Sequence, residues 1–156
     1  MKNRRNFIFA GFSALFALLA GNGYSSQKNW KKEIKTSKAP AAIGPYSQGI
    51  KVDHFLFLSG QIPIDPSTGK LETGGVEKQA RLVFENIKAV LNAAQADFGN
   101  VVKATVFLKD LDNYSKVNKI YASYFKAPFP ARAAVEVARL PKDVEIEVEV
   151  IAYSKA

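Results

Sequence analysis

Residues 144–152 have the sequence VEIEVEVIA, and this stretch decides the fold. Apolar and acidic side chains alternate along it, which is typical of a β-strand with one buried and one exposed face. Residues 131–138 (ARAAVEVA) form a second apolar run, and residues 140–143 (LPKD) lie between the two as a turn. We therefore predict two strands here, paired as an antiparallel hairpin.

Antiparallel pairing of these two strands would determine which side chains face each other. In an antiparallel register Arg132 lies opposite Glu147 or Glu149. Ala134 shares the face of Arg132, whereas Val135 points into the core. A slip of one residue would bury the acidic row, so the pattern determines this facing. For the hairpin alone, cross-strand ion pairs on a solvated face are the simpler interpretation.

Outward from the hairpin, the sequence predicts two helices and two more strands. Apolar residues recur at helical spacing over residues 76–94. A second helix begins near Asp112, a residue type favoured as N-cap, and carries a tyrosine-rich stripe that we expect in the core. Residues 54–59 and 101–109 are strand-like. This order predicts an α+β domain in which both helices cover one face of a mixed sheet.

The composition fits one globular domain with a hydrophobic core. The chain has 156 residues, 47% of them hydrophobic, and a formal net charge of +8 from 22 Lys and Arg against 14 Asp and Glu. It contains no Cys, which excludes disulfides, thiolate zinc sites and Cys nucleophiles.

The first residues are typical of a targeting segment. Three basic residues precede an uncharged apolar run at 7–20, which is short for a membrane span and normal for a signal peptide. We predict cleavage after Gly23, so that residues 1–23 are removed. The pair Arg4-Arg5 resembles a twin-arginine export signal, and general secretion stays open. An uncleaved anchor is the second interpretation.

The predicted location follows from this segment. A cleaved signal places the protein in the periplasm or outside the cell, with no membrane attachment afterwards. If the signal is not used, the protein stays in the cytoplasm.

The positive charge is concentrated before the folded domain. Residues 24–38 form a basic arm with five Lys and one Glu, whereas residues 39–156 carry 14 basic and 13 acidic side chains. We therefore divide the chain into the signal, this arm and a single domain over 39–156. Because the domain is nearly neutral, a surface that binds a nucleic-acid backbone is disfavoured, and no nucleic-acid partner is expected.

Arg132 is the leading candidate for a residue that binds a substrate. Residues 127–130 (APFP) form a stiff approach to it, and a fixed guanidinium is suited to bidentate capture of a carboxylate. A nearby Glu can hold a water or transfer a proton. Together these groups describe a site for a small anionic substrate that reacts with water.

Other chemistries have less support. His54 is the single His, and a structural or surface role suits it better than catalysis. No G-x-S-x-G elbow, phosphate-binding glycine loop or metal-ligand spacing is present in the sequence. We expect no cofactor and no metal.

Four motifs carry a resemblance to a known family. They are residues 39–49 (APAAIGPYSQG), 59–63 (SGQIP), 130–133 (PARA) and 135–142 (VEVARLPK). In this order they resemble the Rid (reactive intermediate deaminase) family, also called the YjgF-like family. The match runs from about residue 32 to residue 152.

The resemblance implies a fold, an assembly and an activity. The fold is chorismate-mutase-like, and the assembly is a homotrimer whose exposed sheet faces meet at its centre, with active sites in clefts between subunits. The activity is hydrolysis of 2-imino acids, such as 2-iminopropanoate and 2-iminobutanoate, to 2-oxo acids and ammonium. The partner is then a small 2-imino acid or another small carboxylate.

The resemblance also implies roles for single residues. Arg132 matches the arginine that clamps the substrate carboxylate, and Glu147 matches the acid that positions the attacking water. The other matching positions are Tyr46, Ser59, Gly60, Asn118 and Ala134. At Ala134 some family members carry a Cys, so thiol-dependent regulation is absent here.

Two alternatives stay open. One is a non-catalytic trimer that binds small carboxylates or acts like a chaperone. The other is RNA cleavage or translational inhibition, against which the export signal and the nearly neutral domain both count. An exported member would also not meet the cytosolic enzymes that release enamines, so its substrate can be a different imine.

Overall fold

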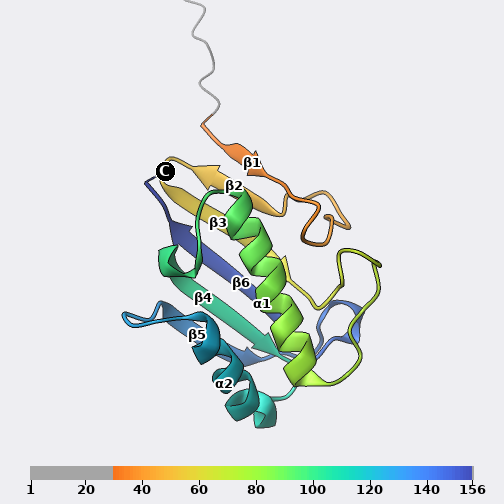
Figure 1. Cartoon of the computed structure of the whole chain (residues 1–156). Helices are drawn as coiled ribbons and strands as arrows, with labels where there is room; N and C mark the ends of the chain where they lie inside the picture. The colour runs from red at the N-terminus through yellow and green to blue at the C-terminus, as the bar shows by residue number, and fades with distance from the viewer. Residues whose placement is uncertain (1–29, 156) are drawn as a thin grey trace, which may run out of the picture.

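The computed structural model describes residues 30–155. Over this range the chain folds as a six-stranded mixed sheet with two α-helices on one face (Figure 1). The strands are β1 (Lys32–Ile34), β2 (Gly49–Val52), β3 (Phe55–Gln61), β4 (Val101–Leu108), β5 (Ala131–Glu136) and β6 (Ile146–Tyr153), and the helices are α1 (Val76–Ala93) and α2 (Tyr114–Tyr124). The predicted signal at 1–23 and the first part of the basic arm lie outside the described residues. No helix in the described range is long and apolar enough to cross a membrane.

Strand β6, in which apolar and acidic residues alternate, lies in the interior of the sheet. The strand order is β1-β2-β3-β6-β4-β5. Strand β6 pairs antiparallel with both of its neighbours. Its apolar residues Ile146, Val148, Val150 and Ala152 are all buried, as the pattern predicts. Strand β6 has β3 on one side, β4 on the other and α1 over one face. This position therefore suits the strand with the most regular alternation of apolar and polar side chains.

The predicted hairpin is wrong. β5 pairs with β4, in parallel, and β4 separates it from β6. The physical reason is burial: β4 places Ala104, Val106 and Leu108 fully in the core, whereas β5 is partly exposed along its length. The two more deeply buried strands therefore pair at the centre. Helix α2 makes the crossover that brings β5 alongside β4.

The predicted facing of Arg132 and Glu147 is wrong for the same reason. Arg132 pairs with Ala104 of β4, whose side chain is in the core under the helices. Glu147 pairs with Phe107, as does Val135, so these residues point to the opposite side. Val135 is accordingly exposed rather than in the core.

The start of α2 also differs from the prediction. A short 3-10 turn, Leu111–Asn113, precedes the helix, and the Asp110 carboxylate caps it by accepting a hydrogen bond from the Asp112 backbone N–H at 2.8 Å. Asp112 is therefore inside this turn and is not the cap. Asn113 occupies the N-cap position of α2 without a side-chain cap bond.

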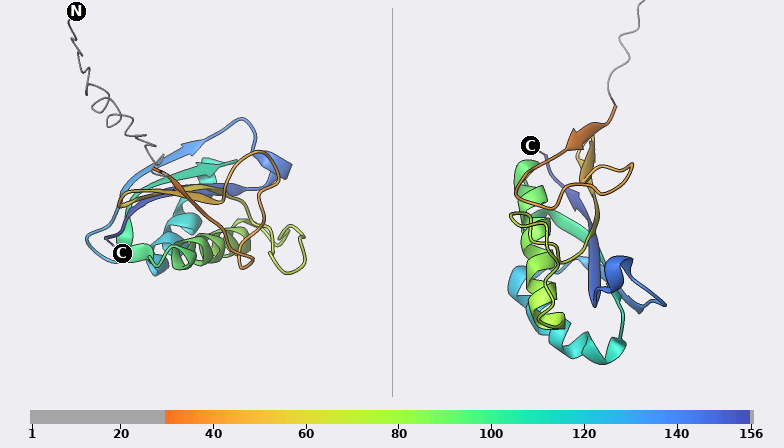
Figure 2. Two further views of the ribbon diagram at one scale, coloured as in Figure 1. Left: turned by 90° about the horizontal axis from the view of Figure 1, so that it is seen from above. Right: turned by 90° about the vertical axis from the view of Figure 1, so that its right-hand side faces the viewer.

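Both helices lie on one side of the sheet (Figure 2). Their contact is an aromatic cluster in which Phe84 of α1 packs against Tyr121, Tyr124 and Phe125. The predicted tyrosine-rich stripe is thus largely in the core, but Tyr114 is 39% exposed. This exception matters for the site described below.

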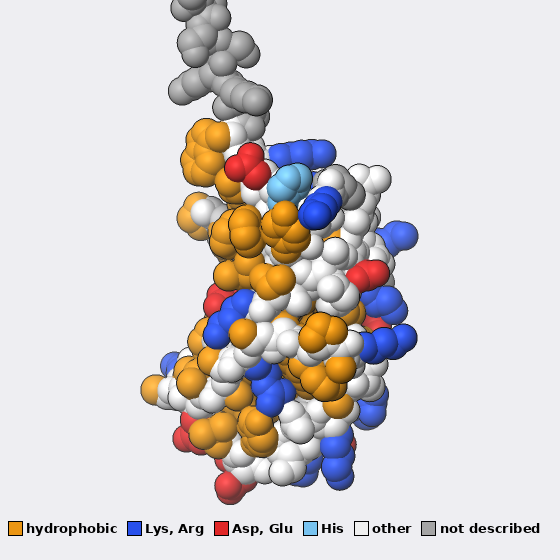
Figure 3. Space-filling view, turned by 90° about the vertical axis from the view of Figure 1, so that its left-hand side faces the viewer, with side chains coloured by type: hydrophobic (Ala, Val, Ile, Leu, Met, Phe, Trp, Pro, Cys, Tyr) orange, Lys and Arg blue, Asp and Glu red, His pale blue; other side chains and the backbone are white. Residues whose placement is uncertain are grey.

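The other side of the sheet has no helix over it in the described range. We call it the open face, and it includes Phe55, Phe57, Phe107, Val135 and Ile151. Phe55 and Phe57 are each 45% exposed, which is unusual for large apolar side chains on a sheet. Hydrophobic side chains also reach the surface over much of the side seen in Figure 3.

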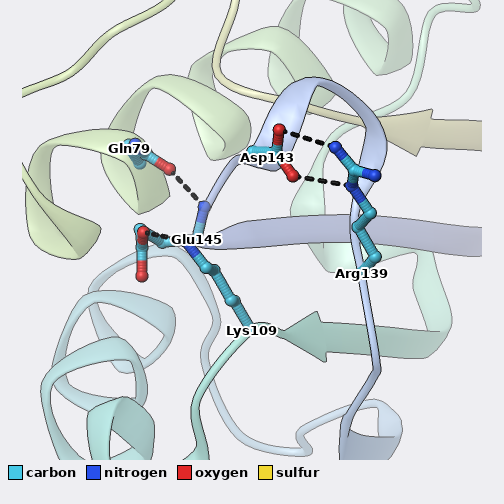
Figure 4. Close-up of polar contacts among 5 residues, drawn as sticks. All are labelled: Gln79, Lys109, Arg139, Asp143 and Glu145. Atoms are coloured by element: carbon cyan, nitrogen blue, oxygen red, sulfur yellow. Dashed lines mark hydrogen bonds and ion pairs between the residues drawn. The ribbon is translucent and has the colours of Figure 1, made fainter.

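A polar network fixes the segment that leads into β6 (Figure 4). The Gln79 side-chain oxygen, on α1, accepts a hydrogen bond from the Glu145 backbone N–H at 2.8 Å. The Lys109 ammonium lies 3.2 Å from the Glu145 carboxylate. Arg139 and Asp143 form a second, exposed ion pair at 2.7 Å. The network therefore ties the beginning of β6 to both α1 and the end of β4.

Candidate functional site

Arg132 is held by three side chains of α2. Its Nη1 donates a hydrogen bond to the Asn118 side-chain oxygen at 2.9 Å, and its Nη2 donates to the Tyr114 hydroxyl oxygen at 2.6 Å. The guanidinium carbon lies 4.5 Å from the centre of the Tyr121 ring. These three residues are spaced by four and then three positions, so they share one face of the helix. We call Arg132, Tyr114, Asn118 and Tyr121 the arginine cluster.

The partners of Arg132 are all neutral. No carboxylate forms an ion pair with Arg132 in the described part of the chain. Burial raises the pKa of the Tyr121 hydroxyl, and the Arg132 charge opposes part of that rise. The guanidinium is therefore fixed in orientation and keeps its charge for an external anion, for which arginine is well suited.

Glu147 lies on the open face, over the backbone of Gly60. A Cβ added at Gly60 would collide with the Glu147 carboxyl group, whose carbon would be 2.8 Å away. Glu147 has no hydrogen bond or ion pair within residues 30–155. Burial raises its pKa, and the neighbouring Glu149 carboxylate raises it further. A carboxylate whose pKa is raised accepts and returns a proton more readily than an ordinary exposed carboxylate does.

Tyr46 lies in the loop that precedes β2, and Ser59 of β3 binds the end of that loop. The Ser59 hydroxyl donates to the Ser47 carbonyl at 2.7 Å, and the Ser59 backbone N–H donates to the Gln48 carbonyl at 3.1 Å. The Tyr46 hydroxyl accepts a hydrogen bond from the Ile43 backbone N–H at 3.2 Å, and its ring is 48% exposed. The loop is thus held against the strand that contains Gly60.

The structure separates the predicted site residues into two groups. Arg132 and Asn118 are in the arginine cluster, and Ala134 lies on the same face, half-buried against the core. Glu147 and Gly60 are in contact, and Ser59 precedes Gly60 on β3. No hydrogen bond or ion pair in the described range joins the two groups. Within one chain, then, Arg132 and Glu147 do not form a single site, and their roles stay predictions.

Sequence reasoning did not single out Tyr114 and Tyr121 as candidate site residues. The sequence pattern places both in a core stripe, but they contact the candidate arginine. Their spacing from Asn118 on a helix was the available signal, because residues three and four apart lie on one face. Pairing β5 with β4 would have been needed to place Arg132 beside them.

Other candidate sites have little structural support. His54 is exposed, with its ring 5.6 Å from that of Tyr153, which agrees with a surface role. No group of three or more potential metal-ligating side chains occurs among the residues that the structure describes. Two surface hollows of about 450 and 430 Å³ lie along α1, and neither is lined by Arg132 or Glu147.

Comparison with known proteins identifies the family. The model of the family described as Endoribonuclease L-PSP matches residues 36–154. The chain belongs to this family. The resemblance to Rid and YjgF proteins is thereby confirmed.

Relatives of the Rid family are similar over most of the chain. A RutC family protein of Pyrococcus abyssi is 56% identical over 125 residues, which are 80% of this chain and 98% of that protein. The human 2-iminobutanoate/2-iminopropanoate deaminase is 52% identical over 122 residues, 78% of this chain and 89% of that protein. The crystal structure of E. coli TdcF with bound serine is 46% identical, has a TM-score of 0.75, and matches over 78% of this chain and 98% of that one.

Proposed function

We propose that this Rid protein hydrolyses small 2-imino acids to 2-oxo acids and ammonium, without a cofactor. The observation that carries the proposal is Arg132, a fixed guanidinium whose partners are all neutral. Relatives of similar length with about 52% identity are named 2-iminobutanoate/2-iminopropanoate deaminases, which supports the same substrate class.

The proposed reaction needs few groups. Arg132 binds the substrate carboxylate and so fixes the neighbouring imine carbon. Glu147 orients a water molecule. The water oxygen adds to the imine carbon while one water proton passes to the Glu147 carboxylate. Glu147 then returns this proton to the nitrogen and takes the remaining hydroxyl proton as the carbon–nitrogen bond breaks. The carbonyl of the 2-oxo acid forms, and the departing ammonia takes up the second proton from Glu147 and leaves as ammonium. Because a protonated imine is already electrophilic, positioning and proton transfer suffice.

We further propose that the site is completed between copies of the chain in a homotrimer. Arg132 and Glu147 lie on opposite faces of the sheet in one copy, so they can act on one substrate only if a second copy supplies one of them. The exposed Phe55 and Phe57 on the open face support self-association.

The test couples an amino acid oxidase, which generates the imine, to the purified protein and follows loss of the imine. Wild type should accelerate the loss, and Arg132→Ala should abolish the acceleration. Arg139→Ala is the matched control, because Arg139 is exposed and pairs only with Asp143 in the described range. No acceleration by wild type, or full activity of Arg132→Ala, would contradict the proposal.

A second candidate function is binding of small carboxylates without turnover. The serine bound in the E. coli TdcF structure favours it. Saturable binding of serine together with no effect on the imine would support this candidate over the deaminase. The family description also names an endoribonuclease. RNA cleavage that weakens steeply with salt would support that activity instead.

A further inference from the structure

The Tyr114 hydroxyl is next to the candidate substrate-binding guanidinium. The Tyr114 oxygen lies 2.6 Å from Arg132 Nη2, and its ring centre is 5.5 Å from the guanidinium carbon. We propose that Tyr114 both positions Arg132 and donates a hydrogen bond to the substrate carboxylate. This inference rests on the proposed function, because it assumes that Arg132 binds a carboxylate.

The direction of the hydrogen bond leaves the Tyr114 proton free. A guanidinium has only donors, so the Tyr114 oxygen must accept from Arg132. Its own proton then points elsewhere. Within residues 30–155 that proton has no acceptor, and the side chain is 39% exposed. The hydroxyl can therefore donate to a ligand that arrives beside Arg132.

Asn118, like Tyr114, accepts a hydrogen bond from Arg132 and keeps donors of its own for a ligand. Its side-chain oxygen accepts from Arg132 Nη1 at 2.9 Å, which assigns the oxygen and nitrogen of the amide. The amide nitrogen then keeps two donors that have no acceptor in the described part of the chain. Arg132, Tyr114 and Asn118 together present donors without a negative charge. Such a set selects an anion with several acceptor oxygens, as a carboxylate has.

Tyr121 restricts how the guanidinium can turn. It is 5% exposed and lies under the guanidinium, with the guanidinium carbon 4.5 Å from its ring centre. The plane of Arg132 is thus held from below by Tyr121 and at its edge by Tyr114. Removing the Tyr114 hydroxyl therefore removes both an edge contact to Arg132 and one donor to the ligand, without removing a ring.

The test uses the full-length protein and Tyr114→Phe. We expect KM for the imine to rise about tenfold with kcat within about twofold, the size of effect for one hydrogen bond to a charged group. Binding of 2-oxobutanoate, measured by calorimetry, should weaken by a similar factor. Binding of its neutral amide, whose oxygen is a weaker acceptor than a carboxylate, should weaken clearly less, which a merely structural role of Tyr114 would not predict.

Tyr124→Phe is the matched control. Tyr124 is on the same helix, but its hydroxyl donates to Glu85 at 3.0 Å and does not contact Arg132. It should leave KM and 2-oxobutanoate binding as in wild type. In a double-mutant cycle with Arg132→Lys, Tyr114→Phe should have a smaller effect than in wild type, because part of its contribution acts through the guanidinium.

The outcomes distinguish this inference from the proposed function. If wild type does not turn over imines but binds 2-oxobutanoate more tightly than Tyr114→Phe, the inference holds and the deaminase proposal fails. If turnover depends on Arg132 and is unchanged in Tyr114→Phe, the inference is overturned and the deaminase proposal holds. Failure of wild type to bind 2-oxobutanoate overturns the inference as well.

Discussion

At the residue scale, the half-buried Glu147 makes the stability of the fold depend on pH. Its pKa is raised above 4.5 by burial and by Glu149, so the folded protein binds this proton more tightly than the unfolded chain does. Its contribution to stability is therefore fully present below the unfolded pKa and is lost as pH rises through the folded pKa. At neutral pH an ionised Glu147 destabilises the fold.

Glu147→Gln should accordingly raise the melting temperature at pH 7, and the gain should shrink as pH falls toward 4. Thermal unfolding followed by circular dichroism at both pH values measures it. Glu149→Gln is the control, since Glu149 is exposed in the same strand and its replacement should gain less. A Glu147→Gln variant no more stable than wild type at pH 7 would show that burial of the carboxylate carries no cost.

The identity of the candidate residues was accessible from sequence, but their arrangement was not. Arg132 follows a stiff approach, and Glu147 belongs to an alternating strand, so both could be singled out. Three of the six residues of β5 are Ala, whose small side chains fit either face. The pattern therefore could not show that Arg132 points toward α2.

At the element scale, the joint between α1 and β6 depends on one side chain. Gln79→Ala would leave the half-buried Glu145 backbone N–H without its acceptor, and we expect a loss of about 1–3 kcal/mol in the free energy of unfolding. Chemical denaturation measures it. Arg139→Ala, which breaks a mostly exposed ion pair in the same network, should match wild type within error. Equal losses in the two variants would contradict this ranking.

The sequence predicted the elements better than their neighbours. The period of two in residues 144–152 and the helical spacing over 76–94 both correspond to observed elements, with ends shifted by about two residues or fewer. Alternation reports which faces of a strand are buried, but it contains no information on which strand lies beside it. The parallel pairing of β4 and β5 is set by burial across the whole sheet.

At the scale of the whole molecule, the open face is the surface through which copies of the chain are proposed to associate. Phe57→Lys places a charge at its centre, between Ile50 and Ile151 in the sheet, and should shift the protein toward the monomer. Analytical ultracentrifugation measures the change. Asn92→Lys adds the same charge on α1, on the other side of the sheet, and should leave the assembly unchanged. A Phe57→Lys protein with the wild-type mass would rule out this surface.

The central position of β6 has a consequence for the order of events in the cell. β6 follows every other described strand in the sequence, so it leaves the ribosome after all of them. Until it does, β1-β2-β3 and β4-β5 are two partial sheets with no strand to join them. A growing chain would thus expose the unpaired edge of β3 once residue 61 has emerged, and that of β4 once residue 108 has emerged. Closure of the sheet is therefore expected as a late step, dependent on residues 146–153.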